Sequence, residues 1–300
     1  MIFSAQEKSV FKEGYQIVAG IDEAGRGALA GPVAAAAVAI RAIIPRDALR
    51  GTPLRDSKLL TSKQREEIFE MIKQEPAIEW RVSFIWPKVV DQINIWQATL
   101  MAWRRCLQKL SHQPNFLFLD GRMEIPRLKI AQRAIVKGDQ KIALLSLASI
   151  MAKVSRDKLM GRLEKKYPQY SLAQHKGYGT RLHFKRLAQF GPSEIHRRSF
   201  RPVFDNLSFR DKVYYIVSQI PRGQVMNYQQ VAQRIGQPRA YRAVGNALNK
   251  NPIPFSLKRT QGRIPCHRVI RSDGRIGGFG RGSQLKRELL QREGYQLDKI

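Results

Sequence analysis

Four carboxylates in the front part of the chain stand where predicted secondary-structure elements begin or end. Asp22 and Glu23 follow a predicted strand, Asp120 ends another, and Asp139 precedes a predicted helix. Active sites of α/β proteins are commonly built at such element ends. Four clustered carboxylates repel one another unless divalent cations neutralise them, and hard oxygen ligands suit Mg²⁺ or Mn²⁺. This is the ligand chemistry of two-metal phosphodiester hydrolysis.

Each carboxylate also has a structural interpretation. Asp139 is an ordinary helix cap, Asp120 is an ordinary turn residue, and Asp22 with Glu23 is a solvated pair in this alternative. Successive side chains of a regular strand face opposite sides, so Asp22 and Glu23 converge only if the backbone turns there. Gly25 and Gly27 provide the conformational freedom for that turn.

A second chemical pattern lies near the other end, where Cys266 is followed by His267. A cysteine beside a histidine can be held as a reactive thiolate. A lone cysteine is more often a small buried hydrophobe, so the pair depends on its context. His112, His183 and His196 match no metal-ligand spacing and are predicted to be structural or surface residues.

The sequence is strongly basic along its whole length. It holds 53 Lys and Arg against 24 Asp and Glu, a net charge of +29. The last 96 residues carry 18 basic and 6 acidic groups, and the rest carry 35 and 18. Both parts are therefore expected to contact nucleic acid. A generally basic proteome and an anionic membrane surface are the alternatives that composition leaves open.

Cysteine content and apolar runs indicate the compartment. Cys106 and Cys266 are too few for a disulfide framework, and the first residues lack the apolar core of a secretory signal. The longest apolar stretch, 28–40, is shorter than the roughly 20 residues that span a bilayer. We therefore expect a cytoplasmic protein with no membrane anchor.

The elements that position these residues follow from hydrophobic periodicity. Thr61 and Gln64 have the spacing of a capping box that opens a helix. Strands are expected at 16–21, 33–40, 82–85, 115–119 and 134–136, and helices at 61–73, 94–110 and in a long segment after 139. Strands that alternate with helices predict an α/β sheet covered by helices.

A Pro-containing segment at 201–207 marks a domain boundary, and three further helices are expected at 209–220, 228–235 and 239–248. The last two are joined by Gly236-Gln237-Pro238, a helix-turn-helix pattern. The predicted domains are 1–204 and 205–300.

The strings around the carboxylates are long and appear in a fixed order. They are GIDEAGRGALAGPV (20–33), DSKLL (56–60), FLDG (118–121), KGD (137–139), ASIMAKVSRD (148–157) and HKGYGT (175–180). Together they closely resemble ribonuclease HII over roughly residues 15–200. The resemblance implies an RNase H-like fold, a central mixed sheet flanked by helices, whose metal ligands fall on Asp22, Glu23, Asp120 and Asp139.

The resemblance also implies how the substrate is recognised. In that family the GRG segment, here Gly25, Arg26 and Gly27, approaches the ribose 2′-hydroxyl at the RNA–DNA junction. Glycine lets main-chain groups reach the hydroxyl that distinguishes RNA from DNA. Tyr178 matches the tyrosine that stacks beside the junction sugar, and Ala28 stands where the family commonly has proline. The implied reaction is attack of metal-activated water on the phosphate 5′ to a ribonucleotide, leaving a 3′-hydroxyl and a 5′-phosphate.

The tail resembles a second family. IPRGQVMNYQQVA (220–232), RAVGNALNKNP (242–252) and PCHRVIRSDGRIGGF (265–279) are similar to the DNA-binding catalytic domain of O6-alkylguanine-DNA alkyltransferases, over about residues 207–298. The resemblance implies that Cys266 accepts the alkyl group, that His267 relays its proton through water, and that Glu293 orients the histidine.

The resemblance assigns three further residues to DNA binding or to the active-site turn. Tyr228 presses on the target phosphate, Arg242 fills the stack vacated by a flipped base, and Asn251 braces the active-site turn. Flipping is chemically necessary, because the alkyl group inside a duplex is out of reach of a thiolate.

The tail also departs from the alkyltransferase pattern. The usual separate N-terminal domain is replaced by the nuclease, and Phe279 replaces a common tyrosine. Fourteen residues separate Asn251 from Cys266, several more than in the family. A non-catalytic lesion-binding module that targets the nuclease is therefore the rival hypothesis, although such binders typically lack the cysteine.

The sequence thus predicts an α/β RNase H-like nuclease domain followed by a small, mostly helical, winged-helix-like helix-turn-helix domain. The expected partners are RNA–DNA hybrid, duplex DNA that contains ribonucleotides, and alkylated DNA. We expect a monomer with two divalent ions, Mg²⁺ or Mn²⁺, in the nuclease site and no cofactor in the tail.

Overall fold

The computed structural model describes residues 3–41, 60–251 and 264–296. It divides into two compact units, Met1–Val203 and Phe204–Ile300, which are described separately. Two parts of the predicted motifs lie outside the described residues. They are residues 56–59 of the DSKLL motif and residues 252–263 of the segment between Asn251 and Cys266.

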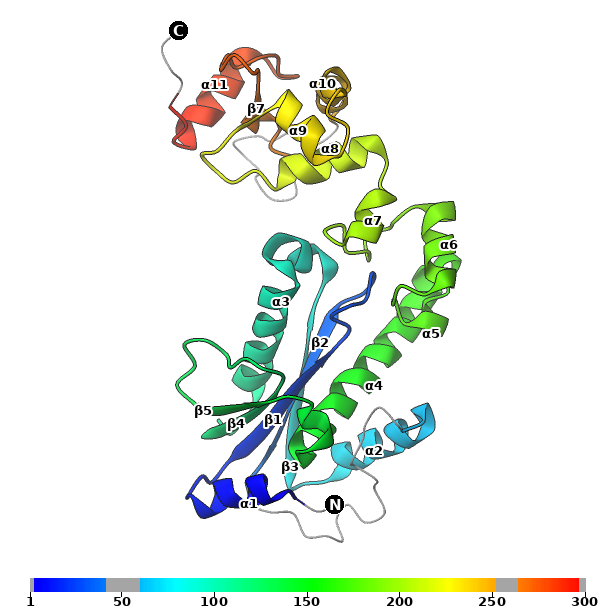
Figure 1. Ribbon diagram of the computed structural model, residues 1–300, viewed down its shortest axis with the longest axis vertical. Helices are drawn as coiled ribbons and strands as arrows, with labels where there is room; N and C mark the ends of the chain where they lie inside the picture. Colours follow the sequence, from blue (N-terminus) through cyan, green and yellow to red (C-terminus); the bar gives the residue numbers. More distant parts are fainter. Residues whose placement is uncertain (1–2, 42–59, 252–263, 297–300) are drawn as a thin grey trace. The chain divides into compact units, whose positions relative to one another are not determined.

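The first unit is built on a mixed five-stranded sheet (Figure 1). Its strands are β1 (Val18–Ala24), β2 (Val33–Ile40), β3 (Ile78–Ile85), β4 (Phe116–Asp120) and β5 (Ala131–Ile135). The spatial order is β3-β2-β1-β4-β5. The β1–β2 and β2–β3 pairs are antiparallel, and the β1–β4 and β4–β5 pairs are parallel. The predicted fold class is confirmed.

Helices cover both faces of this sheet, with α3 on one side and α4 on the other in Figure 1. The helices are α1 (Ala5–Lys12), α2 (Ser62–Gln74), α3 (Pro87–Lys109), α4 (Ala143–Lys166), α5 (Leu172–His175), α6 (Arg181–Phe190) and α7 (Arg201–Asp205), the last of which crosses the division between units. Even-numbered residues of β2 from Ala36 to Ile40 belong to the core with α4. Odd-numbered ones from Ala35 to Ala39 belong to the core with α3. Alternation along one strand therefore separates the two cores.

Capping residues determine where several helices begin. Thr61 and Gln64 form the predicted capping box at the start of α2. Ser4 and Glu7 form a second box at α1, which the sequence analysis missed. Glu7 is fully buried, and its carboxylate is satisfied there because it also accepts hydrogen bonds from the backbone amides of Ala143 and Leu144 at the start of α4. Helix α1 thereby caps the helix that covers the sheet.

Three element boundaries differ from prediction for identifiable reasons. Strand β3 begins at Ile78 rather than 82, since its outer half carries polar residues that conceal a strand at the sheet edge. Strand β5, on the other edge, begins at Ala131 rather than 134 for the same reason. Helix α3 begins at Pro87, but Asn94 inside it has φ 64° and its side chain caps Gln97. A new helical segment thus starts at the predicted Asn94.

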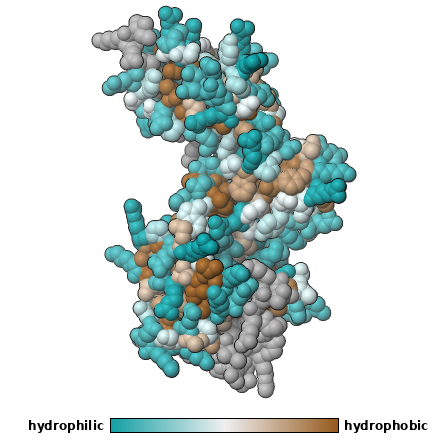
Figure 2. All heavy atoms as spheres, in the orientation of Figure 1, coloured by the Kyte–Doolittle hydropathy of each residue, from teal (hydrophilic) through white to brown (hydrophobic). Residues whose placement is uncertain are grey.

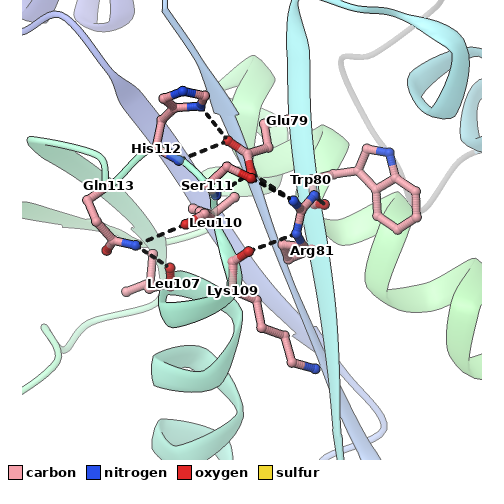
Figure 3. A network of polar contacts seen from close by, with 9 residues as sticks. All are labelled: Glu79, Trp80, Arg81, Leu107, Lys109, Leu110, Ser111, His112 and Gln113. Atoms are coloured by element: carbon pink, nitrogen blue, oxygen red, sulfur yellow. Dashed lines mark hydrogen bonds and ion pairs between the residues drawn. The ribbon is translucent and has the colours of Figure 1, made fainter.

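The polar residues of β3 tie this edge strand to the end of α3 (Figure 3). The Glu79 carboxylate accepts hydrogen bonds from the Ser111 and His112 amides, and it lies 3.3 Å from His112 Nδ1. Arg81 Nε donates to the Lys109 carbonyl at 2.8 Å. His112 is exposed and takes part in this surface network, in agreement with its predicted structural role.

The second unit is mostly helical. Its elements are α8 (Phe209–Ser218), β6 (Met226–Asn227), α9 (Tyr228–Arg234), α10 (Tyr241–Asn249), η4 (Cys266–Arg268), β7 (Val269–Ile270) and α11 (Ser283–Arg292). Asn227 and Gln230 form a capping box at α9. Helices α9 and α10 are the predicted helix-turn-helix pair, and β6 pairs with β7 in parallel. Val213, Val244, Cys266 and Val269 all belong to the hydrophobic core of this unit.

Figure 2 shows hydrophilic residues over most of the visible face, with apolar patches that are small and separate. Among the described helices, none combines the length and apolar character that crossing a membrane requires.

Candidate active sites

Asp22 and Glu23 lie within β1, which continues to Ala24. The predicted backbone turn at these residues is wrong, because both remain paired with β2 in regular register. Asp22 hydrogen-bonds with Ser149 of α4, and Glu23 lies beside Trp103 of α3. The two carboxylates therefore begin on opposite faces of the sheet.

Charge repulsion nevertheless couples these carboxylates to Asp120. Burial, then repulsion by Glu23 and Asp120, holds the pKa of Asp22 well above its usual range. Burial also raises the pKa of Glu23, against the opposing effect of Arg26, whose Nη1 lies 3.2 Å from Glu23 Oε1. The carboxyl ends of β1 and β4 are neighbours in the sheet, so all three acidic groups lie at the same end of these two parallel strands.

Asp139 is attached to the same edge through the backbone. Asp120 Oδ1 accepts a 2.7 Å hydrogen bond from the Gly138 amide, which fixes η2 (Gly138–Gln140) against the end of β4. Asp139 is 1% exposed. It stands in a short 3-10 turn rather than at the start of the long helix α4, which begins four residues later at Ala143.

These residues fit a hard divalent cation in their chemistry. Glu23 Oε2 is buried and accepts no hydrogen bond from the described residues. Asp22, Glu23 and Asp120 repel one another although Arg26 lies beside Glu23, and a divalent cation would offset that repulsion. No three His, Cys, Asp or Glu side chains within 3–41, 60–251 and 264–296 are grouped closely enough to hold an ion.

The segment after β1 is an irregular loop, Gly25–Pro32, which we call the recognition loop. Gly25 has φ +86°, and a Cβ there would lie 2.0 Å from Arg156 Nε. Only glycine fits this position. Gly27 does not have a positive φ, and a Cβ there would meet nothing within 4 Å. Arg26 and Gly27 do form a turn, in which the Ala28 amide donates to the Gly25 carbonyl, but Gly27 needs no left-handed φ to do so. Gly27 is exposed and leaves the loop surface open.

Tyr178 lies next to this loop. Arg156 and Lys153 of α4 lie over its ring, at 5.2 and 5.5 Å from the centroid. The Gly177 carbonyl accepts hydrogen bonds from the Leu29 and Ala30 amides of the recognition loop. The Tyr178 segment is therefore hydrogen-bonded to the loop that carries Gly25, Arg26 and Gly27.

A chain of buried histidines supports the Tyr178 segment. His183 Nδ1 donates to the Tyr178 carbonyl at 3.0 Å, so its Nε2 accepts from His196 Nε2, 3.1 Å away. His196 Nδ1 in turn accepts from the Ser193 amide. His175 stacks on His183 with centroids 4.3 Å apart. Each ring is neutral in this arrangement, so the predicted structural role of His183 and His196 fits.

These histidines predict a loss of stability in acid. Burial lowers the pKa of His183 to about 4 and of His196 to about 3. In the unfolded chain both imidazoles have a pKa near 6.5. Their contribution to the free energy of unfolding is therefore complete above that pH and is lost as the pH falls toward 4. We expect roughly 2 kcal/mol less unfolding free energy at pH 5 than at pH 7 for each histidine.

Urea unfolding at the two pH values tests this expectation. The raised pKa values of Asp22 and Glu7 act in the opposite direction, so the wild type is compared with His196→Asn. The variant should lose less stability on acidification than the wild type, and His112→Asn at the exposed site should behave as the wild type. Equal losses in all three proteins would contradict the prediction.

The second unit gathers its predicted residues around Cys266. The Asn251 side-chain amide lies 3.5 Å from Cys266 Sγ. His267 Nε2 lies 3.1 Å from Glu293 Oε1, and both side chains are buried. Arg268 donates to both Glu293 oxygens at 2.7 Å. A histidine whose Nε2–H points to a carboxylate has Nδ1 as its proton acceptor.

The two remaining predicted residues lie on the helix-turn-helix pair. Tyr228 begins α9, and burial followed by the Cys266 sulfur raises its pKa. Arg242 is exposed on α10 and lies 5.8 Å from the Tyr241 ring centroid. Tyr228 is therefore near the cysteine, while Arg242 faces solvent.

Sequence reasoning missed three buried cations near these sites. Arg156, Arg197 and Lys286 are each 0% exposed. Lys286 Nζ donates to the Val269 carbonyl at 2.6 Å, and burial lowers its pKa to about 8. Arg156 stands four residues after Ala152 and four before Met160 on the buried face of α4. A charge at an apolar helical position was the available signal.

Comparison with known proteins connects each site to a family. The family model "Ribonuclease HII" matches residues 19–203. The model "6-O-methylguanine DNA methyltransferase, DNA binding domain" matches residues 208–295. These ranges contain the carboxylates and Cys266, respectively.

Sequence relatives and solved structures match the first unit. Ribonuclease HII of Desulfitobacterium hafniense is 48% identical over 202 residues, 67% of this chain and 75% of the relative. Ribonuclease HII of Caldicellulosiruptor saccharolyticus is 46% identical over 195 residues, which are 65% of this chain and 91% of the relative. The crystal structure of ribonuclease H2 from Pyrococcus horikoshii is 26% identical with a TM-score of 0.52, covering 63% of this chain and 96% of that one. The RNase HII in the PCNA complex from Archaeoglobus fulgidus is 26% identical with a TM-score of 0.51, covering 60% and 93%. The chain belongs to the ribonuclease HII family, the type 2 ribonucleases H, and its second unit carries the DNA-binding domain of the 6-O-methylguanine DNA methyltransferase type.

Proposed function

We propose that the first unit cuts the RNA strand of RNA–DNA hybrids and incises 5′ to ribonucleotides embedded in duplex DNA. The observation that carries this is the position of Asp22, Glu23 and Asp120 near the carboxyl ends of the adjacent parallel strands β1 and β4, where these acids repel one another directly before the recognition loop. A protein of this family with such carboxylates is suited to phosphodiester hydrolysis. The net charge of +29 supports a nucleic-acid substrate.

The proposed metal ligands are Asp22, Glu23, Asp120 and Asp139. A bound pair of Mg²⁺ or Mn²⁺ ions would supply charge stabilisation and activation of water. The chain's own residues hold the substrate: Gly27 leaves the loop surface open for the ribose, and the ring of Tyr178 lies beside it. Arg26, which is half exposed, is placed to contact the phosphate backbone.

Cleavage of an end-labelled DNA duplex with one ribonucleotide tests this function. A cut immediately 5′ to the ribonucleotide is expected with Mg²⁺ or Mn²⁺, and none with a chelator. A duplex of the same sequence without the ribonucleotide is the control. Absence of the cut with both metals would overturn the proposal.

The two glycines of the recognition loop give a matched prediction. Gly27→Ala should leave the unfolding midpoint unchanged, because its Cβ meets nothing within 4 Å. It should lower cleavage about tenfold or more, because the methyl group occupies the space proposed for the ribose. Gly25→Ala should lose both cleavage and stability, about 1–3 kcal/mol, because of its φ and the Arg156 contact. Full activity of Gly27→Ala would show that the substrate lies elsewhere.

We infer that the second unit removes alkyl groups from O6-alkylguanine by transfer to Cys266. The Cys266 thiol loses its proton to His267 Nδ1 through a water, as Glu293 holds Nε2. The sulfur attacks the alkyl carbon, the S–C bond forms, the bond from carbon to guanine O6 breaks, and the base is protonated to guanine. Asn251 braces the thiol.

The proposed contacts with DNA come from the helix-turn-helix pair. Tyr228 would press on the target phosphate, and Arg242, exposed on α10, would fill the stack after the base flips. The rival function is a binding module that delivers the nuclease to alkyl lesions without chemistry. The His267–Glu293 pair beside a cysteine favours transfer.

Intact mass separates transfer from binding. After incubation with O6-methylguanine DNA, transfer adds one methyl group to the chain, and peptide mapping places it on Cys266. An unchanged mass in the presence of tight binding to the lesion would establish the binding module instead.

A further inference from the structure

Two buried arginines lie beneath the recognition loop. Arg156 of α4 and Arg197, which follows α6, are both fully buried. Neither forms an ion pair with any residue in the described part of the chain. A buried guanidinium without an acid is costly unless its donors are satisfied, so the polar contacts of these two residues identify their role.

The hydrogen bonds that the Arg156 and Arg197 side chains donate go to backbone carbonyls. Arg156 donates through Nε to Pro32, through Nη2 to Ala30 and through Nη1 to Lys176, at 2.9, 3.0 and 2.8 Å. With the bonds of Arg197 that follow, the two side chains pair five carbonyls from two loops that are distant in sequence. Together with the backbone hydrogen bonds that join the recognition loop to Gly177 and Ile195, these bonds determine where the two loops lie.

Arg197 holds the part of the loop that carries the GRG segment. Its Nη1 donates to the Arg26 carbonyl at 2.7 Å, and its Nε and Nη2 donate to the Gly31 carbonyl at 3.1 and 3.0 Å. Arg156 adds packing contacts to the same surface, since it passes beneath Gly25 and lies 5.2 Å from the Tyr178 ring centroid.

We propose that Arg156 and Arg197 are positioning residues that set the surface which recognises the ribonucleotide. They hold the recognition loop and the Lys176–Tyr178 segment at fixed positions relative to each other. This inference rests on the proposed function of that surface. Lysine cannot replace either residue, because a single ammonium group lacks the planar guanidinium fork that reaches several separate carbonyls at once.

The test is binding discrimination without divalent metal, where no strand is cut. The affinities for an all-DNA duplex and for the same duplex with one ribonucleotide are measured for the wild type, Arg197→Lys, Arg156→Lys and Arg162→Lys. Arg162 is exposed on α4 and serves as the matched control. Urea unfolding confirms that each variant is folded at the assay temperature.

We expect the wild type and Arg162→Lys to prefer the ribonucleotide duplex equally. In Arg197→Lys and Arg156→Lys the preference should fall about tenfold, as the loss of one or two hydrogen bonds would produce. Affinity for all-DNA duplex should stay constant, because the charge is retained. A purely structural role would lower the unfolding midpoint without changing the preference.

Each other outcome has a distinct meaning. Folded lysine variants with an unchanged preference would overturn the positioning role and leave the proposed nuclease function intact. A wild type without any preference would overturn the recognition surface itself, and the positioning role with it. If neither lysine variant folds, the arginines support the whole unit rather than the surface, and the proposal is wrong.

Discussion

Asp22→Asn should reduce cleavage of a ribonucleotide-containing duplex by at least about a thousandfold, because it removes a ligand charge from the proposed metal site. The amide has nearly the shape of the carboxylate, so affinity for the duplex should change by less than about twofold. Single-turnover cleavage and equilibrium binding measure the two quantities. Wild-type cleavage by this variant would show that Asp22 is not a ligand.

The same variant has a second expected effect that does not depend on activity. Asp22 is buried and repelled by Glu23 and Asp120. Neutralising it should therefore raise the unfolding midpoint of the metal-free protein. Glu66→Gln, at an exposed carboxylate of α2, is the control and should alter neither cleavage nor stability. A lower midpoint for Asp22→Asn would mean that repulsion does not dominate at this edge.

Cys266→Ser should abolish methyl transfer completely, because a serine hydroxyl beside His267 is far less acidic and less nucleophilic than a thiol. The chain mass should then stay constant after incubation with O6-methylguanine DNA. Cys106→Ala is the matched control: Cys106 donates to the Ala35 carbonyl, and burial raises the pKa of its thiol to about 12. It should transfer the methyl group at the wild-type rate.

Glu293→Gln extends this test to the histidine. The change removes the carboxylate that faces His267 Nε2 and Arg268. Methyl transfer should slow by about ten- to a hundredfold without stopping.

The Cys266→Ser variant decides which residue is the acceptor. If Cys266→Ser still gains a methyl group, another residue is the acceptor and the assignment of Cys266 is incorrect.

Much of the fold follows from the sequence, because local and global preferences agree there. The run of small apolar residues at 33–40 is β2 as expected. Thr61 caps α2, and Asn94 opens the second segment of α3, each through its own side chain. The edge strands were predicted too short, because their polar residues face solvent and neighbouring loops rather than a core.

The sequence indicated where the acidic residues of the candidate site lie in the fold, but not which residues support them. Asp120 ends β4, and Asp22 with Glu23 lies within the last three residues of β1, whereas Asp139 lies in a 3-10 turn. The expected turn at Asp22 and Glu23 was wrong, since the sheet continues and neighbouring charges couple through it. Arg197 was missed because its partners are carbonyls, which leave no mark on the side-chain pattern. Arg156 also donates to carbonyls, but its charge at an apolar helical position was a signal that sequence reasoning did not use.

Two activities on one chain are tested most directly by one duplex that carries both a single ribonucleotide and an O6-methylguanine. It is incubated with the wild type, Asp22→Asn or Cys266→Ser in Mg²⁺ or Mn²⁺, and the DNA cut and the protein mass are read from the same sample. The account predicts both a cut and a methyl gain for the wild type, a methyl gain alone for Asp22→Asn, and a cut alone for Cys266→Ser. A wild type that cuts without gaining mass, or that gains mass without cutting, would contradict it.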